Sequence, residues 1–258
     1  MTSLTSPIQI TDITKSYGAT QVIAETSLTV LEGEFVSLLG PSGSGKSTIL
    51  NMIGGLAFPT TGSVEALGAP VTAPGPERGM VFQHHALLPW MTARGNIDFG
   101  LRSARPGLSA AEREARTTQY LDSVGLTHAA DRRPARLSGG MQQRVGLARA
   151  FAVDPEILLL DEPFGALDAL TRRQLQNLLL EVWEANRRTV VMVTHDVDEA
   201  VLLSDRILVM SPGPDATIIE DLRVDIQRPR VGAAGASDSG VEKRTSELRR
   251  HLLGLLEH

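Results

Sequence analysis

The feature that most constrains this chain is a glycine-rich octet between two stretches of different periodicity. The octet reads Gly40-Pro41-Ser42-Gly43-Ser44-Gly45-Lys46-Ser47 and fits the pattern G-x-x-x-x-G-K-[ST]. Residues 34–39 before it form a short apolar run that predicts a buried strand, and residues 47–56 after it carry apolar positions at helical spacing. A strand that leads through such a loop into a helix predicts an α/β fold.

The octet has the composition that binding of a phosphate group requires. Its glycines allow the backbone to curl until several N–H groups point at one centre, and the N-terminus of the next helix adds partial positive charge there. We expect Lys46 to reach the β- and γ-phosphates and the Ser47 hydroxyl to bind Mg²⁺. The predicted site for ATP and Mg²⁺ comprises residues 40–47 and Thr48. The alternative is a glycine-rich turn before a chance lysine, but lysine occurs only at positions 15, 46 and 243.

A second motif places two acids at the end of an apolar run, residues 157–160. Ligands of open α/β sheets bind at the carboxyl ends of the strands, so these acids are expected near the phosphates. Asp161 would hold Mg²⁺ through its water shell, and Glu162 would orient and deprotonate the attacking water. The alternative is a strand that ends in surface acids. A small-molecule kinase would use the same two motifs, so they leave the class of reaction open.

A third motif is Leu137-Ser138-Gly139-Gly140-Met141-Gln142-Gln143-Arg144, at the predicted start of another helix. The Ser138 hydroxyl and the backbone N–H groups of Gly139 and Gly140 would form a second anion-binding helix end. This end lies about ninety residues after the octet. A chain with two such ends would complete one phosphate site by pairing with a second copy, so we predict a homodimer.

Strand and helix patterns alternate around these motifs. Apolar positions within residues 8–30 predict a pair of strands around a turn at Tyr17-Gly18. Further strands are predicted at residues 62–68, 79–83, 189–194 and 206–210, and further helices at 109–124, 169–185 and 241–258. Ser109 and Glu112 have the spacing of a capping box. The alternation indicates a parallel sheet with crossover helices, interrupted by a mainly helical stretch from about residue 84 to 154.

The third motif resembles the signature of ATP-binding-cassette (ABC) ATPases, and the other motifs follow in that family's order over residues 8–222. The resemblance implies a P-loop NTPase core with a mostly parallel sheet, an N-terminal antiparallel β subdomain and an inserted helical subdomain. The implied catalytic core is 1–83 with 155–222, and the helical signature subdomain is 84–154. Residues 223–258 would form a linker, centred on 227–240, and a C-terminal helix.

The resemblance also assigns roles to four residues that would be unremarkable one by one. Tyr17 would stack on adenine, and Gln83 would contact Mg²⁺ and sense the γ-phosphate. Asp168 would belong to the D-loop, and His195 would be the switch histidine. Taken singly, a tyrosine near a turn is more often a packing residue, a glutamine after a strand is more often solvated, and a histidine there is more often structural.

Together these inferences define a candidate site. The expected catalytic groups are Glu162, His195, Lys46 and Gln83, and the expected metal ligands are Ser47, Gln83 and Asp161. Two copies would hold two ATP molecules head to tail, so that Lys46 and Glu162 of one copy face the signature of the other. The residues of that signature which would face the ATP are Ser138, Gly139 and Gly140.

The branch of the family is indicated by Met141, which stands where the commonest signature has Gln, and by residues 87–90. Both resemble importers of nitrate, sulfonate and taurine, although Trp90 would also suit a packed position in the helical lobe. This branch implies a motor subunit, peripheral on the cytoplasmic face of the inner membrane, with transmembrane permease subunits and a solute-binding protein as partners.

Composition limits the alternatives. The net charge of 25 − 30 = −5 argues against nucleic acid as a partner. The absence of cysteine excludes disulfides and thiolate sites. No apolar run approaches the roughly 20 residues of a spanning helix. The main alternative function is a non-transport ABC ATPase that acts on ribosomes or nucleic acid, and a P-loop kinase is a third.

Overall fold

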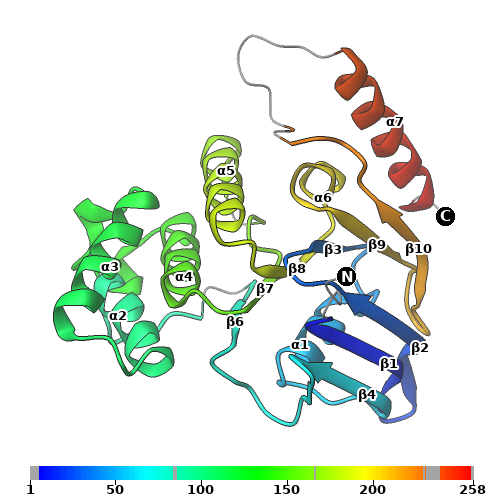
Figure 1. Ribbon diagram of the computed structural model, residues 1–258, viewed down its shortest axis with the longest axis horizontal. Coiled ribbons are helices and arrows are strands. Elements are labelled where there is room, and N and C mark those ends of the chain that lie inside the picture. Colours follow the sequence, from blue (N-terminus) through cyan, green and yellow to red (C-terminus); the bar gives the residue numbers. More distant parts are fainter. Residues whose placement is uncertain (1–5, 84–85, 166, 229, 231–238, 257–258) are drawn as a thin grey trace, which may run out of the picture. The chain divides into compact units, whose positions relative to one another are not determined.

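The computed structural model describes residues 6–83, 86–165, 167–228, 230 and 239–256. The chain divides into two compact units, which are described separately (Figure 1). The first combines Met1–Ala73 with Thr189–His258, and the second is Pro74–Arg188. Within the described ranges, no helix has the length and apolar character needed to cross a membrane.

The first unit opens with an antiparallel sheet of order β2-β1-β4-β5. Its strands are β1 (Ile8–Tyr17), β2 (Thr20–Val30), β4 (Thr61–Ala66) and β5 (Ala69–Pro70). In β1, Ile8, Ile10 and Ile13 are buried and supply one face of the core. The antiparallel N-terminal subdomain that the sequence predicts is present.

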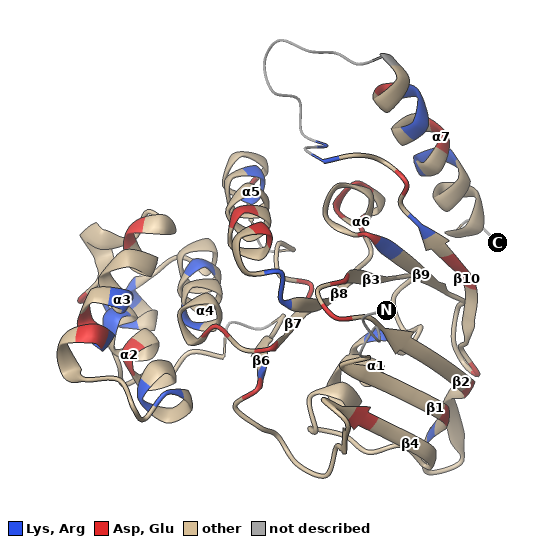
Figure 2. Cartoon of the chain, in the orientation of Figure 1, with Lys and Arg blue, Asp and Glu red and all other residues tan. Residues whose placement is uncertain are grey.

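A second sheet of the first unit is built around β3 (Phe35–Leu39), which runs parallel to both β8 (Thr189–Thr194) and β9 (Arg206–Met210). Strand β10 (Ile218–Arg223) pairs antiparallel with β9. All residues of β3 and β8 are buried, and β3 carries no charged side chain (Figure 2). A strand buried on both faces reads as a continuous apolar run, which is why the sequence predicts β3 and β8 well.

The register of these strands positions the candidate site. Leu39, the last residue of β3, pairs with Thr194 at the end of β8 and with Val209 near the end of β9. The segments that follow these strands therefore leave the same edge of the sheet. The glycine-rich octet follows β3, and His195 follows β8.

Three helices complete the first unit. They are α1 (Lys46–Ile53), α6 (Val197–Leu203) and α7 (Ser239–Leu256). Helix α1 ends at Ile53, with Gly54 as its C-cap, three residues before the end of the predicted pattern. The terminal helix is present from residue 239, and its Leu252 is fully buried against α6 and β9 in one apolar cluster (Figure 1). Most of the predicted linker, residues 229 and 231–238, lies outside the described residues.

The second unit contains two parallel strands and the longer helices of the middle of the chain. Strands β6 (Arg78–Val81) and β7 (Ile157–Asp161) pair in parallel. The helices are α2 (Ala93–Ala104), α3 (Ala110–Ser123), α4 (Gly139–Val153) and α5 (Ala169–Asn186), with 3₁₀ turns η1 (Thr127–Ala129) and η2 (Pro134–Arg136). The capping box that Ser109 and Glu112 predict at the start of α3 is confirmed.

Helices α2 and α6 and strand β10 are not predicted by the sequence pattern. Gly95 and Gly100 lower the helix propensity of α2, but Gly100 is needed where the helix packs, since a Cβ there would lie 2.8 Å from Arg149 Cγ. Helix α6 has seven residues, too few for a periodic pattern to be read. In both helices, tertiary packing rather than local propensity decides the structure.

Candidate active site

The octet forms a loop whose backbone conformation favours glycine at two positions. Gly43 has φ +81° and Gly45 has φ +77°, in the left-handed region. Space excludes side chains as well: a Cβ on Gly45 would lie 2.1 Å from Ile23 Cδ1, and one on Gly40 would lie 2.9 Å from the Met210 carbonyl oxygen. The loop is therefore enclosed by β2 and by the end of β9.

Helix α1 begins at Lys46 and presents its N-terminus to this loop. No side chain caps it, and its first turn carries no acidic residue. Since the first four N–H groups of a helix have no intrahelical acceptor, this end favours an anion. The structure thus bears out the local geometry expected of the octet, a strand followed by a curled loop and an uncapped helix.

The ammonium group of Lys46 lies within the loop itself. Its Nζ donates to the carbonyl oxygens of Gly40 at 2.8 Å and Pro41 at 2.6 Å and to Ser44 Oγ at 3.1 Å. The residue is only 5% exposed. A charged group held by three oxygens at the base of a glycine-rich loop is oriented before any phosphate arrives.

A contact that no motif of the sequence predicts supports the loop from outside. A Cβ on Gly213 would lie 2.6 Å from the Gly43 carbonyl oxygen, so the segment after β9 touches the octet's backbone. The only hint in the sequence is the dipeptide Gly213-Pro214, which is typical of a turn after a strand.

Tyr17 and His195 belong to the same unit as the loop. Tyr17 ends β1 and is 55% exposed, with Lys15 Nζ 4.7 Å from the centre of its ring. An exposed ring with a cation on it is available for stacking, unlike the packed tyrosine that is the common alternative. His195 is exposed directly after β8.

In the second unit, Gln83 and Glu162 are brought together. Val81 pairs with Leu160, so the ends of β6 and β7 lie side by side and the residues that follow them meet. Gln83 Nε2 donates to Glu162 Oε2 at 3.1 Å, across 79 residues of sequence. This bond orients the carboxylate that the sequence predicts as the general base.

Glu162 itself has an unusual backbone. Its φ is +44°, a left-handed conformation that costs a residue with a Cβ about 1–2 kcal/mol. Such conformations persist where the surroundings impose them, and they gather at functional sites. Asp161, one residue before, ends β7 and is 8% exposed, so the two adjacent acids occupy different environments.

The third motif starts α4, as predicted. Ser138 is the N-cap, and its Oγ accepts the Met141 N–H at 3.3 Å, while Gly139 is exposed in the first turn. Gln143 from the same motif is 2% exposed, and its Nε2 donates to the Pro163 carbonyl oxygen at 2.8 Å. This bond connects the signature helix to the segment directly after Glu162, a connection that the sequence does not reveal.

Asp168 is the N-cap of α5, and its Oδ1 accepts the Thr171 N–H at 3.0 Å. The hydrogen bond from the Thr171 backbone N–H, and to a smaller extent that with the Thr171 side chain, lowers the pKa of Asp168. Asp168 is exposed, and Ala166 of the same motif lies outside the described residues. The structure thus gives Asp168 a capping role, and its D-loop role stays a prediction.

The predicted Mg²⁺ ligands offer a hydroxyl, an amide and a carboxylate, the hard oxygen donors that Mg²⁺ prefers. Ser47 belongs to the first unit, and Gln83 and Asp161 to the second. Within the described ranges, no cluster of three or more His, Asp or Glu could hold a metal ion. The chemistry of these donors suits Mg²⁺, which usually keeps several waters and binds through one or two carboxylates together with substrate phosphates.

Comparison with known proteins identifies the family. A family model described as ABC transporter matches residues 23–165, which is more than half of the chain. This chain belongs to the ABC transporter family. Its ATP-binding cassette accounts for the glycine-rich loop, the two acids and the signature helix in one chain.

Close relatives support the assignment. The cassette is 48% identical to the nitrate import ATP-binding protein NrtD of Synechococcus elongatus, over 91% of this chain and 84% of that protein. It is 47% identical to the bicarbonate transport ATP-binding protein CmpD of Synechocystis, over 88% of this chain and 82% of that protein. Its identity to the nitrate transport protein NasD of Klebsiella oxytoca is 48%, over 91% of this chain and 88% of that protein.

Solved structures agree. The dimeric, post-hydrolysis structure of the ATP-binding cassette MJ0796 bound to ADP and Pi has a TM-score of 0.76 and 35% identity, covering 84% of this chain and 98% of that one. The predicted α/β cassette fold and the predicted class, an ATPase that binds nucleotide, are therefore confirmed. The roles of single site residues remain predictions.

Proposed function

We propose that this ABC ATPase drives an importer for nitrate or a related small anion, as a homodimer attached to permease subunits at the cytoplasmic face of the inner membrane. The observation that carries the proposal is the 48% identity with a nitrate import ATP-binding protein along 91% of the chain. The bicarbonate relative, at 47%, fits a small inorganic anion as the transported class. Sulfonate and taurine remain alternatives to be tested.

In the proposed mechanism, the octet holds the triphosphate. The N-terminus of α1 and the curled backbone donate N–H groups, and Lys46 exchanges one of its loop oxygens for a phosphate oxygen. Ser47, Asp161 and Gln83 would hold Mg²⁺, which supplies charge neutralisation at the β- and γ-phosphate oxygens. Tyr17 offers its exposed ring to the adenine.

Glu162 then positions and deprotonates the attacking water. Its backbone strain and its bond to Gln83 fix the direction of the carboxylate, and the same bond links the base to a residue expected at the metal. His195 would contact the γ-phosphate. Ser138, Gly139 and Gly140 complete the site of the other copy, a reading supported by the dimeric structures of a similar cassette.

The permease contact is proposed for the second unit. Trp90 is 65% exposed, and Phe99 on α2 is 43% exposed. Exposed aromatic side chains of this kind are enriched in interfaces. The packed position considered for Trp90 is therefore wrong, and the side chain is available to a partner.

The test compares Mg²⁺-dependent ATP hydrolysis by the full chain with that of Glu162→Gln. Loss of a general base predicts a decrease in kcat of about 10²- to 10⁴-fold, with ATP-loaded dimers accumulating on gel filtration. Glu156→Gln removes an exposed acid just before β7 and serves as the control. Equal rates in the two variants, or no hydrolysis by the wild type, would refute the mechanism.

The transported class is tested separately with the permease complex in membranes. Binding protein loaded with nitrate should stimulate hydrolysis more than the same protein offered bicarbonate or taurine. Association with ribosomes or nucleic acid, and none with a membrane subunit, would favour the alternative function.

A further inference from the structure

Helix α6 connects the predicted switch histidine to the C-terminal part of the chain. The turn before it is fixed by hydrogen bonds: Thr194 Oγ1 donates to Glu199 Oε2 at 2.8 Å, and the Asp196 N–H donates to Thr194 Oγ1 at 3.0 Å. Asp196 Oδ1 accepts the N–H groups of Asp198 and Glu199. Thr194 and Glu199 are almost fully buried, so these bonds attach the backbone on either side of His195 to the start of α6.

Helix α6 cannot hold this position by itself. It has seven residues, far fewer than the roughly 12–15 that an isolated helix needs for marginal stability in water. Its location must come from what packs against it and from what satisfies its ends. The carbonyl groups of residues 201–204 are the ones that lack an intrahelical donor, since the Ser204 N–H already bonds Ala200.

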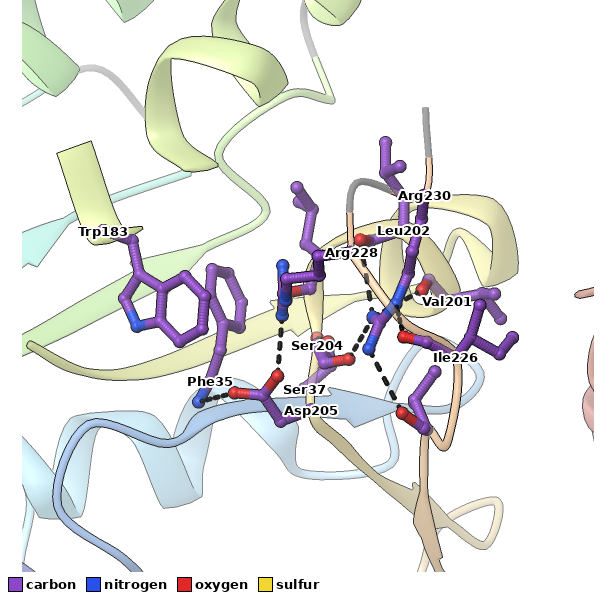
Figure 3. A network of polar contacts seen from close by, with 12 residues as sticks. Phe35, Ser37, Trp183, Val201, Leu202, Ser204, Asp205, Ile226, Arg228 and Arg230 are labelled. Carbon is purple, nitrogen blue, oxygen red and sulfur yellow. Dashed lines mark hydrogen bonds and ion pairs between the residues drawn. The ribbon is translucent and has the colours of Figure 1, made fainter. Parts of the chain in front are cut away.

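Two arginines from the segment after β10 supply donors to all four carbonyls (Figure 3). Arg230 donates to Val201 at 2.9 Å, to Leu202 at 3.5 Å and to Ser204. Arg228 donates to the carbonyl of Leu203 at 2.6 Å, and also bonds the Asp205 carboxylate.

The remaining nitrogens of Arg230 bond its own segment, at the carbonyls of Ile226 at 2.9 Å and Val224 at 3.2 Å. One guanidinium therefore joins the end of α6 to the backbone that follows β10. Burial, together with the charge of Arg228, lowers the pKa of Arg230 to about 10, so the group remains charged at neutral pH.

Helix α7 covers the same region. Its Leu252 is fully buried in a cluster with Val197, Ala200 and Val201 of α6. Arg249 of α7 forms an ion pair with Asp198, in the first turn of α6, at 2.9 Å. That pair is exposed and weak, so the network around Arg230 is the stronger attachment.

We propose that Arg230 is a positioning residue for ATP hydrolysis: by bonding the last carbonyls of α6, it fixes the helix that begins two residues after His195. The proposal rests on the proposed function, since it needs His195 to act in turnover. Arg230 lies 26 residues beyond Ser204, and its hydrogen bonds to described residues go to carbonyls outside the candidate site.

The experiment measures kcat and KM for ATP in the full chain. Arg230→Ala should lower kcat about 10- to 100-fold, because small displacements of a catalytic group have effects of that size, while KM changes less than about twofold. Arg230→Lys keeps the charge but reaches fewer carbonyls, so its kcat should lie between those of the wild type and of Arg230→Ala. Arg250→Ala, a change at an exposed arginine of α7, should leave kcat unchanged.

The decisive measurement repeats Arg230→Ala in a His195→Ala background. If Arg230 acts through His195, the second change should alter kcat less than about twofold there. An equal loss in both backgrounds, an unchanged kcat for Arg230→Ala, or a His195→Ala variant with full kcat would overturn the inference. Failure of the proposed function would be recognised separately, by a wild-type chain whose hydrolysis does not depend on Glu162.

Discussion

Gly45→Ala tests whether the phosphate loop is fixed by its surroundings or only by its own backbone. Two costs add at this position. An alanine at φ +77° costs about 1–2 kcal/mol in the left-handed region. Its Cβ would also lie 2.1 Å from Ile23 Cδ1, and Ile23 is fully buried, so the core must shift, at about 1–3 kcal/mol.

Gly68 provides a matched control in the same unit. It also has φ +77°, but a Cβ there would have nothing within 4 Å. Gly68→Ala should therefore lose only the backbone cost of about 1–2 kcal/mol, against about 2–5 kcal/mol for Gly45→Ala. Because Gly45 is the N-cap of α1, Gly45→Ala should also weaken ATP binding, and Gly68→Ala should not.

The assay is urea unfolding of both full-length variants, with ATP affinity measured by titration. If the two alanines reduce the free energy of unfolding equally, the enclosure of the loop by Ile23 contributes nothing and the reasoning is wrong. A Gly45→Ala variant with wild-type ATP affinity would remove the link between loop geometry and phosphate binding.

Three further predictions follow from single residues. Lys46→Ala should weaken ATP binding strongly in a titration, whereas Lys243→Ala, at an exposed lysine of α7, should leave it intact. Gly139→Asp should abolish turnover while each monomer still binds ATP, because the damaged half-site serves the other copy; a matching loss of monomer affinity would contradict the shared site. Hydrogen bonding with the Ser109 side chain, and to a smaller extent with the Ser109 backbone, lowers the pKa of Glu112. The ionised Glu112 carboxylate therefore stabilises the folded state above pH 4.5, and this stabilisation is lost as pH falls through the lowered pKa. The protection of the α3 amides, measured as the exchange rate relative to the intrinsic rate at the same pH, should therefore decrease on acidification, and Glu112→Gln should flatten that dependence.

The sequence predicts much of this molecule because several of its parts are local. The strand β3, the octet and the start of α1 are contiguous, and each element has the composition that its own conformation requires. The capping box of α3 is likewise contained within four residues. Helices α2 and α6 were missed because glycines or shortness obscure their pattern, and packing supplies their stability.

What the sequence by itself determined is the chemistry: a phosphate loop, an acid pair and a signature helix, since binding a phosphate needs neighbouring backbone groups and these must be adjacent in the chain. Only the tertiary structure decided how that chemistry is oriented. Gln83 meets Glu162 across 79 residues, Ile23 closes on Gly45, and Arg230 holds α6. Such contacts depend on which strands pair and which helices pack, and no pattern within one segment encodes them.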